Sequence, residues 1–248
     1  MAQRLRRLAL TASLGLAIAL IISVPAAAQS LSLDLGDGTT TTTRIVQLVA
    51  LLTVLSLAPS IIIMVTSFTR IVVVLAFLRS AIGTQQTPPN TVIVSLALFL
   101  TAFVMAPTFE AAYEQGIEPL INEEITQTEA FERSMAPVKV FMVTHVRDQD
   151  LRLFLDLAEI ENIEGPEATP LRALIPAFMI SELRRAFEIG FLLFIPFVII
   201  DMVVASILMS MGMMMLPPIM ISLPFKLIFF VLVDGWYLVA GSLVQSFG

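Results

Sequence analysis

The amino-acid sequence predicts an all-α protein made of membrane-associated helical hairpins, with four apolar stretches in two pairs and a helical acidic segment inserted between the pairs. Its composition is the first reason: 57% of the 248 residues are hydrophobic and only 14% are charged, whereas about a quarter of the residues of a soluble domain are charged. The second reason is the acidic segment, residues 110–172, which holds fourteen acidic side chains and five basic ones. We therefore expect helices that lie in a membrane or in a large apolar assembly.

The first 28 residues are typical of a cleaved signal peptide. Basic residues among the first seven precede a short apolar run, and three alanines then end at Ala28. This order predicts cleavage between Ala28 and Gln29 and leaves residues 29–248 as one domain. The alternative is a retained transmembrane helix, but the apolar run is shorter than the roughly 20 residues of a span. A cleaved signal and an even number of spans together predict that both termini lie outside the cytoplasm.

The first apolar pair spans residues 44–109. Its first stretch, Ile45–Leu78, would measure about 51 Å as one helix, against a hydrocarbon core of about 30 Å. We expect this stretch to kink at Pro59, to project from the bilayer or to pack inside an assembly. The second stretch, Thr91–Ala106, ends at Pro107 and would measure only about 24 Å.

Apolar side chains recur at helical spacing within the acidic segment. Leu151, Phe154, Leu155 and Ala158 follow one helix face, which predicts amphipathic helices rather than disorder. An acidic composition is compatible with an extracytoplasmic position. His145, the only histidine of the chain, lies here without an acid or base arrangement around it, and we interpret it as structural.

The second apolar pair, residues 173–247, contains the stretches Ile189–Met209 and Ile219–Val244, with a methionine-rich loop at 211–218 between them. Seven of the thirteen methionines fall in or beside this loop. Methionine is unbranched and deformable, so loops from several chains would fill a variable aperture, and a hydrophobic ring blocks water and ions by dewetting. Two other interpretations stay open: an apolar turn buried against neighbours, and a thioether copper site. The residues predicted to form the seal are Met211, Met213, Met214 and Met215.

Four charged residues fall inside the apolar stretches, where a charged carboxylate at the bilayer centre costs about 2.5–3.5 kcal/mol on insertion scales. We therefore expect Asp201 and Asp234 to face a partner or a cavity, and Arg70 and Lys226 are candidates to pair with them. For Asp201, a proton relay and a buried polar contact between helices or subunits are both open. Residues this distant in sequence leave the pairing undetermined.

A charged group precedes the third apolar stretch. Glu182 and Arg185 lie three residues apart on a predicted helix, residues 181–190, and are placed to pair locally. A contact with another subunit, made by Glu182, Arg184 and Arg185, is an equal alternative.

Composition excludes most enzyme chemistry. The chain has no cysteine and one histidine, which excludes disulfides, thiolate metal sites and a histidine-rich metal site. No nucleophile elbow, P-loop or dinucleotide fingerprint accompanies its serine, aspartate and glutamate residues. We predict no catalytic site, no metal and no cofactor.

Several strings resemble the FliP family of flagellar protein-export gate subunits, and the resemblance covers roughly residues 44–247. The most specific is Pro176–Phe191, sixteen residues of mixed polar and apolar type. The other matching strings are Thr66–Ile71, Phe77–Arg79, Gly83–Asn90, Pro196–Ser206, Ile221–Lys226 and Val233–Trp236.

The resemblance implies a pore-building subunit of the flagellar type III export gate, through which unfolded flagellar subunits leave the cytoplasm. Members of this family form a ring or helical stack of about five copies with FliQ and FliR, beside FlhA and FlhB. The stack would belong to the inner membrane at the flagellar basal body, largely at or above the periplasmic face, in contact with lipid and not with nucleic acid. The methionine-rich loop matches the family's seal in type and position.

Two alternative functions remain open. Relatives in virulence-type injectisomes share the core, but the predicted signal peptide favours the flagellar branch. The other alternative is a small-solute or ion transporter in which Asp201 is the coupling carboxylate.

Overall fold

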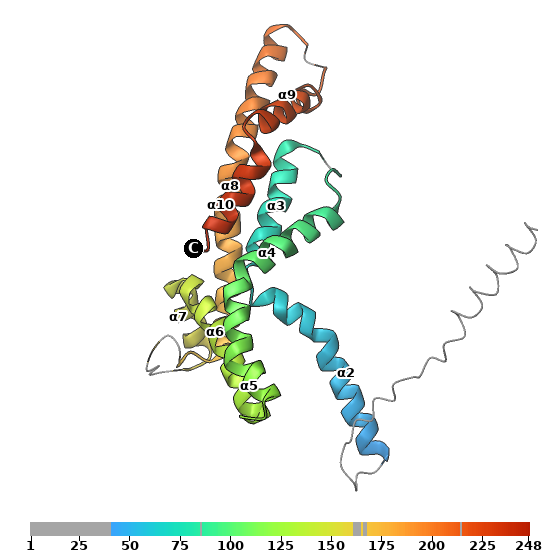
Figure 1. Cartoon of the computed structure of the whole chain (residues 1–248). Helices are drawn as coiled ribbons and strands as arrows, with labels where there is room; N and C mark the ends of the chain where they lie inside the picture. The colour runs from blue at the N-terminus through green and yellow to red at the C-terminus, as the bar shows by residue number, and fades with distance from the viewer. Residues whose placement is uncertain (1–40, 85, 161–164, 166–167, 214) are drawn as a thin grey trace, which may run out of the picture. The chain divides into compact units, whose positions relative to one another are not determined.

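The computed structural model describes residues 41–248 apart from residues 85, 161–164, 166–167 and 214. Every element in this part of the chain is a helix, so the prediction of an all-α fold is confirmed (Figure 1). The predicted signal peptide with its cleavage site at Ala28 and Gln29, and Met214 of the predicted seal, lie outside the described residues. The chain divides into two compact units, Met1–Thr53 and Val54–Gly248.

Helix α2, Thr41–Met64, begins the described part of the chain. Its segment Ile45–Met64 carries no charged residue and, at 20 residues, is long enough to cross a membrane. The helix continues through Pro59, so the long apolar stretch is not divided there. It is divided at residues 65–67, after which α3, Phe68–Ile82, begins.

Helix α3 is followed by α4, Asn90–Ala112. The prediction that this second stretch ends at Pro107 is wrong, because α4 runs through that residue. It continues as the π-helix η1, Tyr113–Ile117, and as α5, Glu118–Ile121. An interior proline removes its own N–H donor and its ring crowds the carbonyl oxygen four residues earlier, but packing against α6 holds the segment beyond it.

The described part of the acidic segment is largely helical, as predicted. It forms α6, Gln127–His145, which starts after the capping residue Thr126, and α7, Asp148–Leu157, which packs on α8. Gly116 of η1 lies so close to α6 that a Cβ at this position would overlap the Oγ of Ser134. Only glycine permits this approach of the two helices.

Helix α8, Leu171–Ser210, is a single helix of 40 residues, about 60 Å long. The prediction treated residues 181–190 and the third apolar stretch separately, but the helix includes both. Arg184 and Arg185 do not interrupt it because their side chains are exposed. Helices α3, α6, α7 and α9 all pack against α8 (Figure 1).

The predicted fourth stretch consists of two helices, α9, Pro218–Leu232, and α10, Gly235–Gln245. They meet at an angle of 63°, and the bend falls at Asp234, whose φ is 50°. By length and composition, three described helices could cross a membrane, or four if the bent pair counts as one span. Of the four predicted stretches, the first is thus divided between α2 and α3, and the fourth between α9 and α10.

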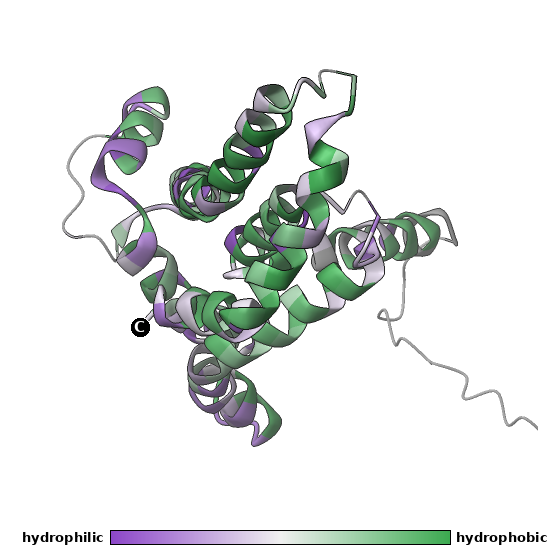
Figure 2. Cartoon of the chain, turned by 90° about the horizontal axis from the view of Figure 1, so that it is seen from above, coloured by the Kyte–Doolittle hydropathy of each residue, from purple (hydrophilic) through white to green (hydrophobic). Residues whose placement is uncertain are grey.

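Two clusters of buried apolar residues lie between the helices. One includes Ile71 of α3 and Ala186 of α8, and the other includes Met105 of α4 and Met142 of α6; all four side chains are fully buried. The outward faces are also apolar, and hydrophobic residues cover much of the outside of the helices (Figure 2). Apolar surface of this extent is typical of a protein buried in lipid or against partners.

Candidate functional site

The methionine-rich loop joins α8 to α9 (Figure 1). Gly212, with a φ of 73°, ends α8: its N–H donates to the carbonyl oxygen of Met209 at 3.1 Å, and the N–H of Met213 donates to that of Leu208 at 3.0 Å. This pair of bonds is a Schellman cap, which needs the left-handed conformation that glycine adopts without strain. Pro218 then starts α9, because its fixed φ suits the first helical turn.

The described methionines of the loop project into open space. Met211 is 61% exposed, Met213 is 42% exposed and Met215 is 98% exposed. Met209 and Met220 on the flanking helices are exposed as well. The hairpin therefore ends in a group of large, flexible apolar side chains that the chain itself leaves uncovered.

Below the loop, the two hairpin helices are joined by an ion pair. The Nζ of Lys226 lies 2.6 Å from the Oδ2 of Asp201, and the Oγ of Ser222 donates to Oδ1 at 2.5 Å. Lys226 also donates to the carbonyl oxygen of Ala81 at the end of α3, at 3.2 Å. Of the two predicted candidates for Asp201, the structure therefore selects Lys226. Sequence reasoning missed Ser222, although it lies four residues before Lys226 and hence on the same helix face.

The other candidate base, Arg70, pairs with neither aspartate. Its Nε donates to the Oε2 of Glu182 at 2.8 Å, and its second terminal nitrogen binds Oε1. The remaining nitrogen donates to the carbonyl oxygen and Oγ of Ser246, at 2.9 and 3.0 Å. The guanidinium also lies over the ring of Phe247, 3.7 Å from its centroid. Nothing in the sequence pointed to the C-terminal residues, which lie far from Arg70 along the chain.

The remaining predicted charges stay on the surface. Arg184 pairs with Glu188 at 2.9 Å, and both are exposed. Arg185 is exposed and makes no ion pair within the part of the chain that the structure describes. The side chain of Asp234 is exposed and does not cap α10. Glu182, in contrast, is fully buried and pairs with Arg70 rather than with Arg185.

His145 links the end of α6 to the C-terminus. Its Nδ1 lies 2.8 Å from the carbonyl oxygen of Phe141, and its Nε2 lies 3.3 Å from that of Phe247. The ring also packs against the rings of Phe141 and Phe247. His145 therefore helps to hold the C-terminal residues over Arg70.

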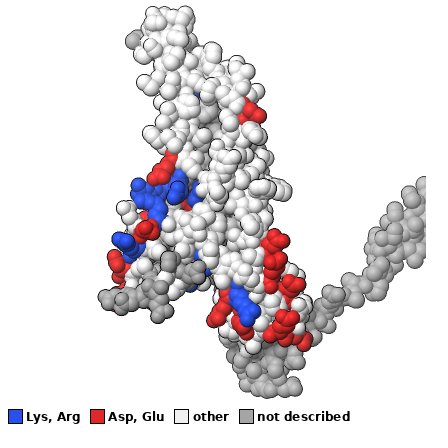
Figure 3. Space-filling view, turned by 60° about the vertical axis from the view of Figure 1, so that its left-hand side comes forward, with Lys and Arg blue, Asp and Glu red and all other residues white. Residues whose placement is uncertain are grey.

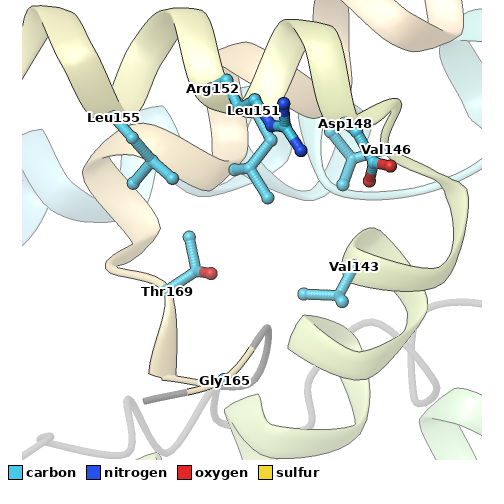
Figure 4. Close-up of a pocket in the computed structure, with 8 residues that line it drawn as sticks. All are labelled: Val143, Val146, Asp148, Leu151, Arg152, Leu155, Gly165 and Thr169. Carbon is cyan, nitrogen blue, oxygen red and sulfur yellow. The ribbon is translucent and has the colours of Figure 1, made fainter. Parts of the chain in front are cut away.

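A hollow of about 500 Å³ lies between α6, α7 and the segment before α8. Figure 4 shows Asp148 and Arg152 as its charged lining residues, with aliphatic side chains around them. Within the described ranges, no three His, Cys, Asp or Glu side chains gather to hold a metal ion. Its described polar lining thus consists of one carboxylate, one guanidinium and the hydroxyl of Thr169.

Charged side chains are unevenly distributed over the surface. In the view of Figure 3 they gather over the lower part of the molecule, whereas the part toward the methionine-rich loop is nearly free of them. The apolar faces, the internal ion pairs and the exposed loop together define a helical membrane-associated protein whose surface suits lipid or other chains.

The chain matches the FliP family over residues 51–243 and belongs to that family. It is 69% identical over 204 residues to the flagellar biosynthetic protein FliP of Caulobacter vibrioides, covering 82% of this chain and 77% of that protein. It is 56% identical over 202 residues to the protein of the same name in Bacillus subtilis, covering 82% and 91%. With that of Aquifex aeolicus it shares 55% identity over 204 residues, covering 82% and 85%.

These comparisons confirm the resemblance seen in the sequence. The relatives are named for flagellar biosynthesis, and their names refer to no catalytic activity. The chain is thus a membrane-associated flagellar biosynthesis protein of the FliP family.

Proposed function

We propose that this chain is a pore-forming subunit of the flagellar type III protein-export gate, and that its methionine-rich loop seals the channel. The observation that carries the proposal is the loop itself. Met211, Met213 and Met215 are exposed at the end of a hairpin whose surroundings carry few charges. Side chains of this kind exclude water and ions from a narrow passage when several copies converge.

A seal of this type needs several chains. The exposed apolar faces of α8 and α9 provide surface for packing copies together. Arg185 and Asp234, which are exposed, are candidates for polar contacts at the edges of such an interface. We propose a homo-oligomer of about five copies joined by FliQ and FliR, with FlhA and FlhB nearby, as the family implies.

The cargo and location follow from the same family membership. We propose that unfolded flagellar subunits pass through the assembled pore and that the stack lies largely at or above the periplasmic face of the inner membrane. The predicted signal peptide supports that placement. The injectisome alternative is weaker because the relatives compared are flagellar proteins.

The transporter alternative loses support at Asp201. A coupling carboxylate must change partners as its cargo moves, whereas Asp201 is already compensated by Lys226 and accepts a second bond from Ser222. We therefore favour a structural role for this residue.

The test is to replace Met211, Met213, Met214 and Met215 with alanine in the full chain. We expect the variant to assemble normally and to make the membrane leak ions, which is measured as conductance across vesicles carrying the assembled protein. Met64→Ala is the matched control, because Met64 is also exposed, at 42%, but lies on α2. Equal conductance of the loop variant and the control would contradict the seal.

A further inference from the structure

The two helices that carry the methionine-rich loop are joined by a polar clamp, which we define as Asp201, Ser222 and Lys226. We propose that this clamp positions the loop for sealing, so that its residues are positioning residues of the gate. The inference rests on the seal proposed above. It adds the parts of the chain that would hold the seal in place.

The clamp crosses the hairpin at nearly the same height on both arms. Asp201 precedes the end of α8 at Ser210 by nine residues, and Lys226 follows the start of α9 at Pro218 by eight. These segments correspond to about 14 Å and 12 Å of helix. The contact between Asp201 and Lys226 therefore fixes the separation of the two helix segments that lead to the loop. These two segments, which we call the arms of the hairpin, are of similar length.

Apolar packing above the clamp is sparse. On α9 the buried residues are Ser222, Lys226 and Phe230, so none lies between the clamp and the loop. On α8 only Val204 and Leu208 are buried beyond Asp201. A hollow of about 400 Å³ opens between the two arms, and its lining is entirely apolar. Since close packing is what normally fixes the separation of two helices, the arms depend on their polar contacts.

The contacts of the clamp are directional, and its lysine is shielded from solvent. Lys226 is 6% exposed at its side chain, and Asp201 is 32% exposed. In surroundings of low polarity such bonds are stronger than in water. Both oxygens of Asp201 are engaged, one by Lys226 and one by Ser222. This two-point attachment restrains rotation of α9 as well as its distance from α8.

The clamp is also anchored to the rest of the fold. The Nζ of Lys226 donates to the carbonyl oxygen of Ala81 in the last turn of α3, where the helix dipole favours a cation. Ala81 and its neighbours Leu78 and Ile82 are buried in the core. The hairpin is therefore tied to the core at the level of the clamp.

The absence of cysteine in the chain allows a direct test. Ser210→Cys and Ile219→Cys place two spin labels at the ends of α8 and α9, at positions that flank the loop. The labelled full chain is mixed with excess unlabelled chain in lipid nanodiscs. Pulsed electron paramagnetic resonance then measures the distance between the two labels of one chain. Conductance of vesicles carrying the same variants is measured in parallel, at equal amounts of assembled particle.

We expect a single narrow distance distribution in the parent chain. Asp201→Asn removes the negative charge that faces the Lys226 ammonium group, and we expect it to broaden the distribution and raise the conductance. Asp201→Glu restores a carboxylate, and we expect it to recover the narrow distribution. Arg133→Gln is the control, because it breaks an exposed ion pair with Glu129 on α6, and we expect it to leave both readings unchanged.

An unchanged distribution in Asp201→Asn would overturn the clamp, as would a distribution in Asp201→Glu as broad as that of the asparagine variant. If Asp201→Asn does not accumulate, Ser222→Ala takes its place, since it removes one hydrogen bond and keeps the ion pair. Failure of the seal is read separately. If the distances broaden in Asp201→Asn but the methionine variants do not leak ions, the seal is overturned. If the distances stay unchanged in Asp201→Asn and the methionine variants leak, only the clamp is overturned.

Discussion

The guanidinium of Arg70 and the carboxylate of Glu182 form a two-point ion pair in which neither side chain reaches solvent, at 1% and 0% exposure. The pair joins α3 to α8 across 112 positions of sequence. A pair this deeply buried is stable only when its remaining hydrogen-bonding groups are satisfied. Ser246 accepts the remaining hydrogen bonds of the Arg70 guanidinium, and the ring of Phe247 covers it.

Breaking the pair from one side is predicted to be more harmful than removing it. Glu182→Gln leaves Arg70 buried without a counter-charge, and we expect it to lower the free energy of unfolding by about 3–5 kcal/mol. The double change Arg70→Met with Glu182→Leu fills a similar volume without charge, and we expect it to cost less than the single change. Thermal loss of helical circular dichroism in detergent measures both. A glutamine variant as stable as the parent would refute the assignment.

The C-terminal ring is predicted to stabilise the same site. Phe247→Ala removes the ring beneath the Arg70 guanidinium, and we expect a loss of about 1–2 kcal/mol in the free energy of unfolding from the cation–π contact and the uncovered area. Phe247→Tyr keeps the ring and should remain close to the parent. If alanine and tyrosine behave alike in the same thermal measurement, the ring does not act in this way.

The contact between η1 and α6 is predicted to tolerate no side chain at Gly116. A Cβ there would overlap Ser134 Oγ and lie 2.6 Å from the carbonyl oxygen of Ala130, so Gly116→Ala must separate the two helices and lower the unfolding temperature. Gly241→Ala is the matched control. Gly241 lies inside α10, and a Cβ added to it would meet no atom within 4 Å, so alanine there should stabilise by about 0.5–1 kcal/mol. Comparable losses at both positions would argue against a special contact.

The purified particle is predicted to contain several copies of the chain. Arg185→Glu reverses an exposed charge at a candidate interface, and we expect it to shift the particle toward smaller mass. Arg133→Glu reverses a charge on α6 and should leave the mass unchanged. Native mass spectrometry of particles extracted in mild detergent gives the copy number directly. A parent chain that extracts as a monomer without other subunits would undo the pore proposal.

Helical class and the approximate positions of the apolar segments were accessible from sequence, because both depend on local periodicity and composition. The ends of helices were less accessible. Pro107 is a strong helix-ending signal, yet packing of Gly116 on α6 holds the helix together beyond it. Likewise Arg184 and Arg185 mark a change in polarity without marking the end of a helix, because their long side chains reach solvent from the side of α8.

The ion pairs were the part of the structure that the sequence predicted least well. The sequence supplied Asp201, Asp234, Arg70 and Lys226 as unpaired candidates, but which of them meet depends on how α3, α8 and α9 cross. For Glu182 the sequence predicts a local or inter-subunit contact, because its neighbours in sequence offer partners at helical spacing. The fold placed Arg70 there instead, and no local pattern carries that information.

The position of Ser246 and Phe247 also has a consequence for biosynthesis. Arg70 and Glu182 are translated long before the residues that cover them, and a chain that still holds residues 246 and 247 inside the ribosome cannot present them to Arg70. Closure of the interior therefore waits until those residues have emerged, and any product that stops short of residue 246 keeps an uncovered guanidinium.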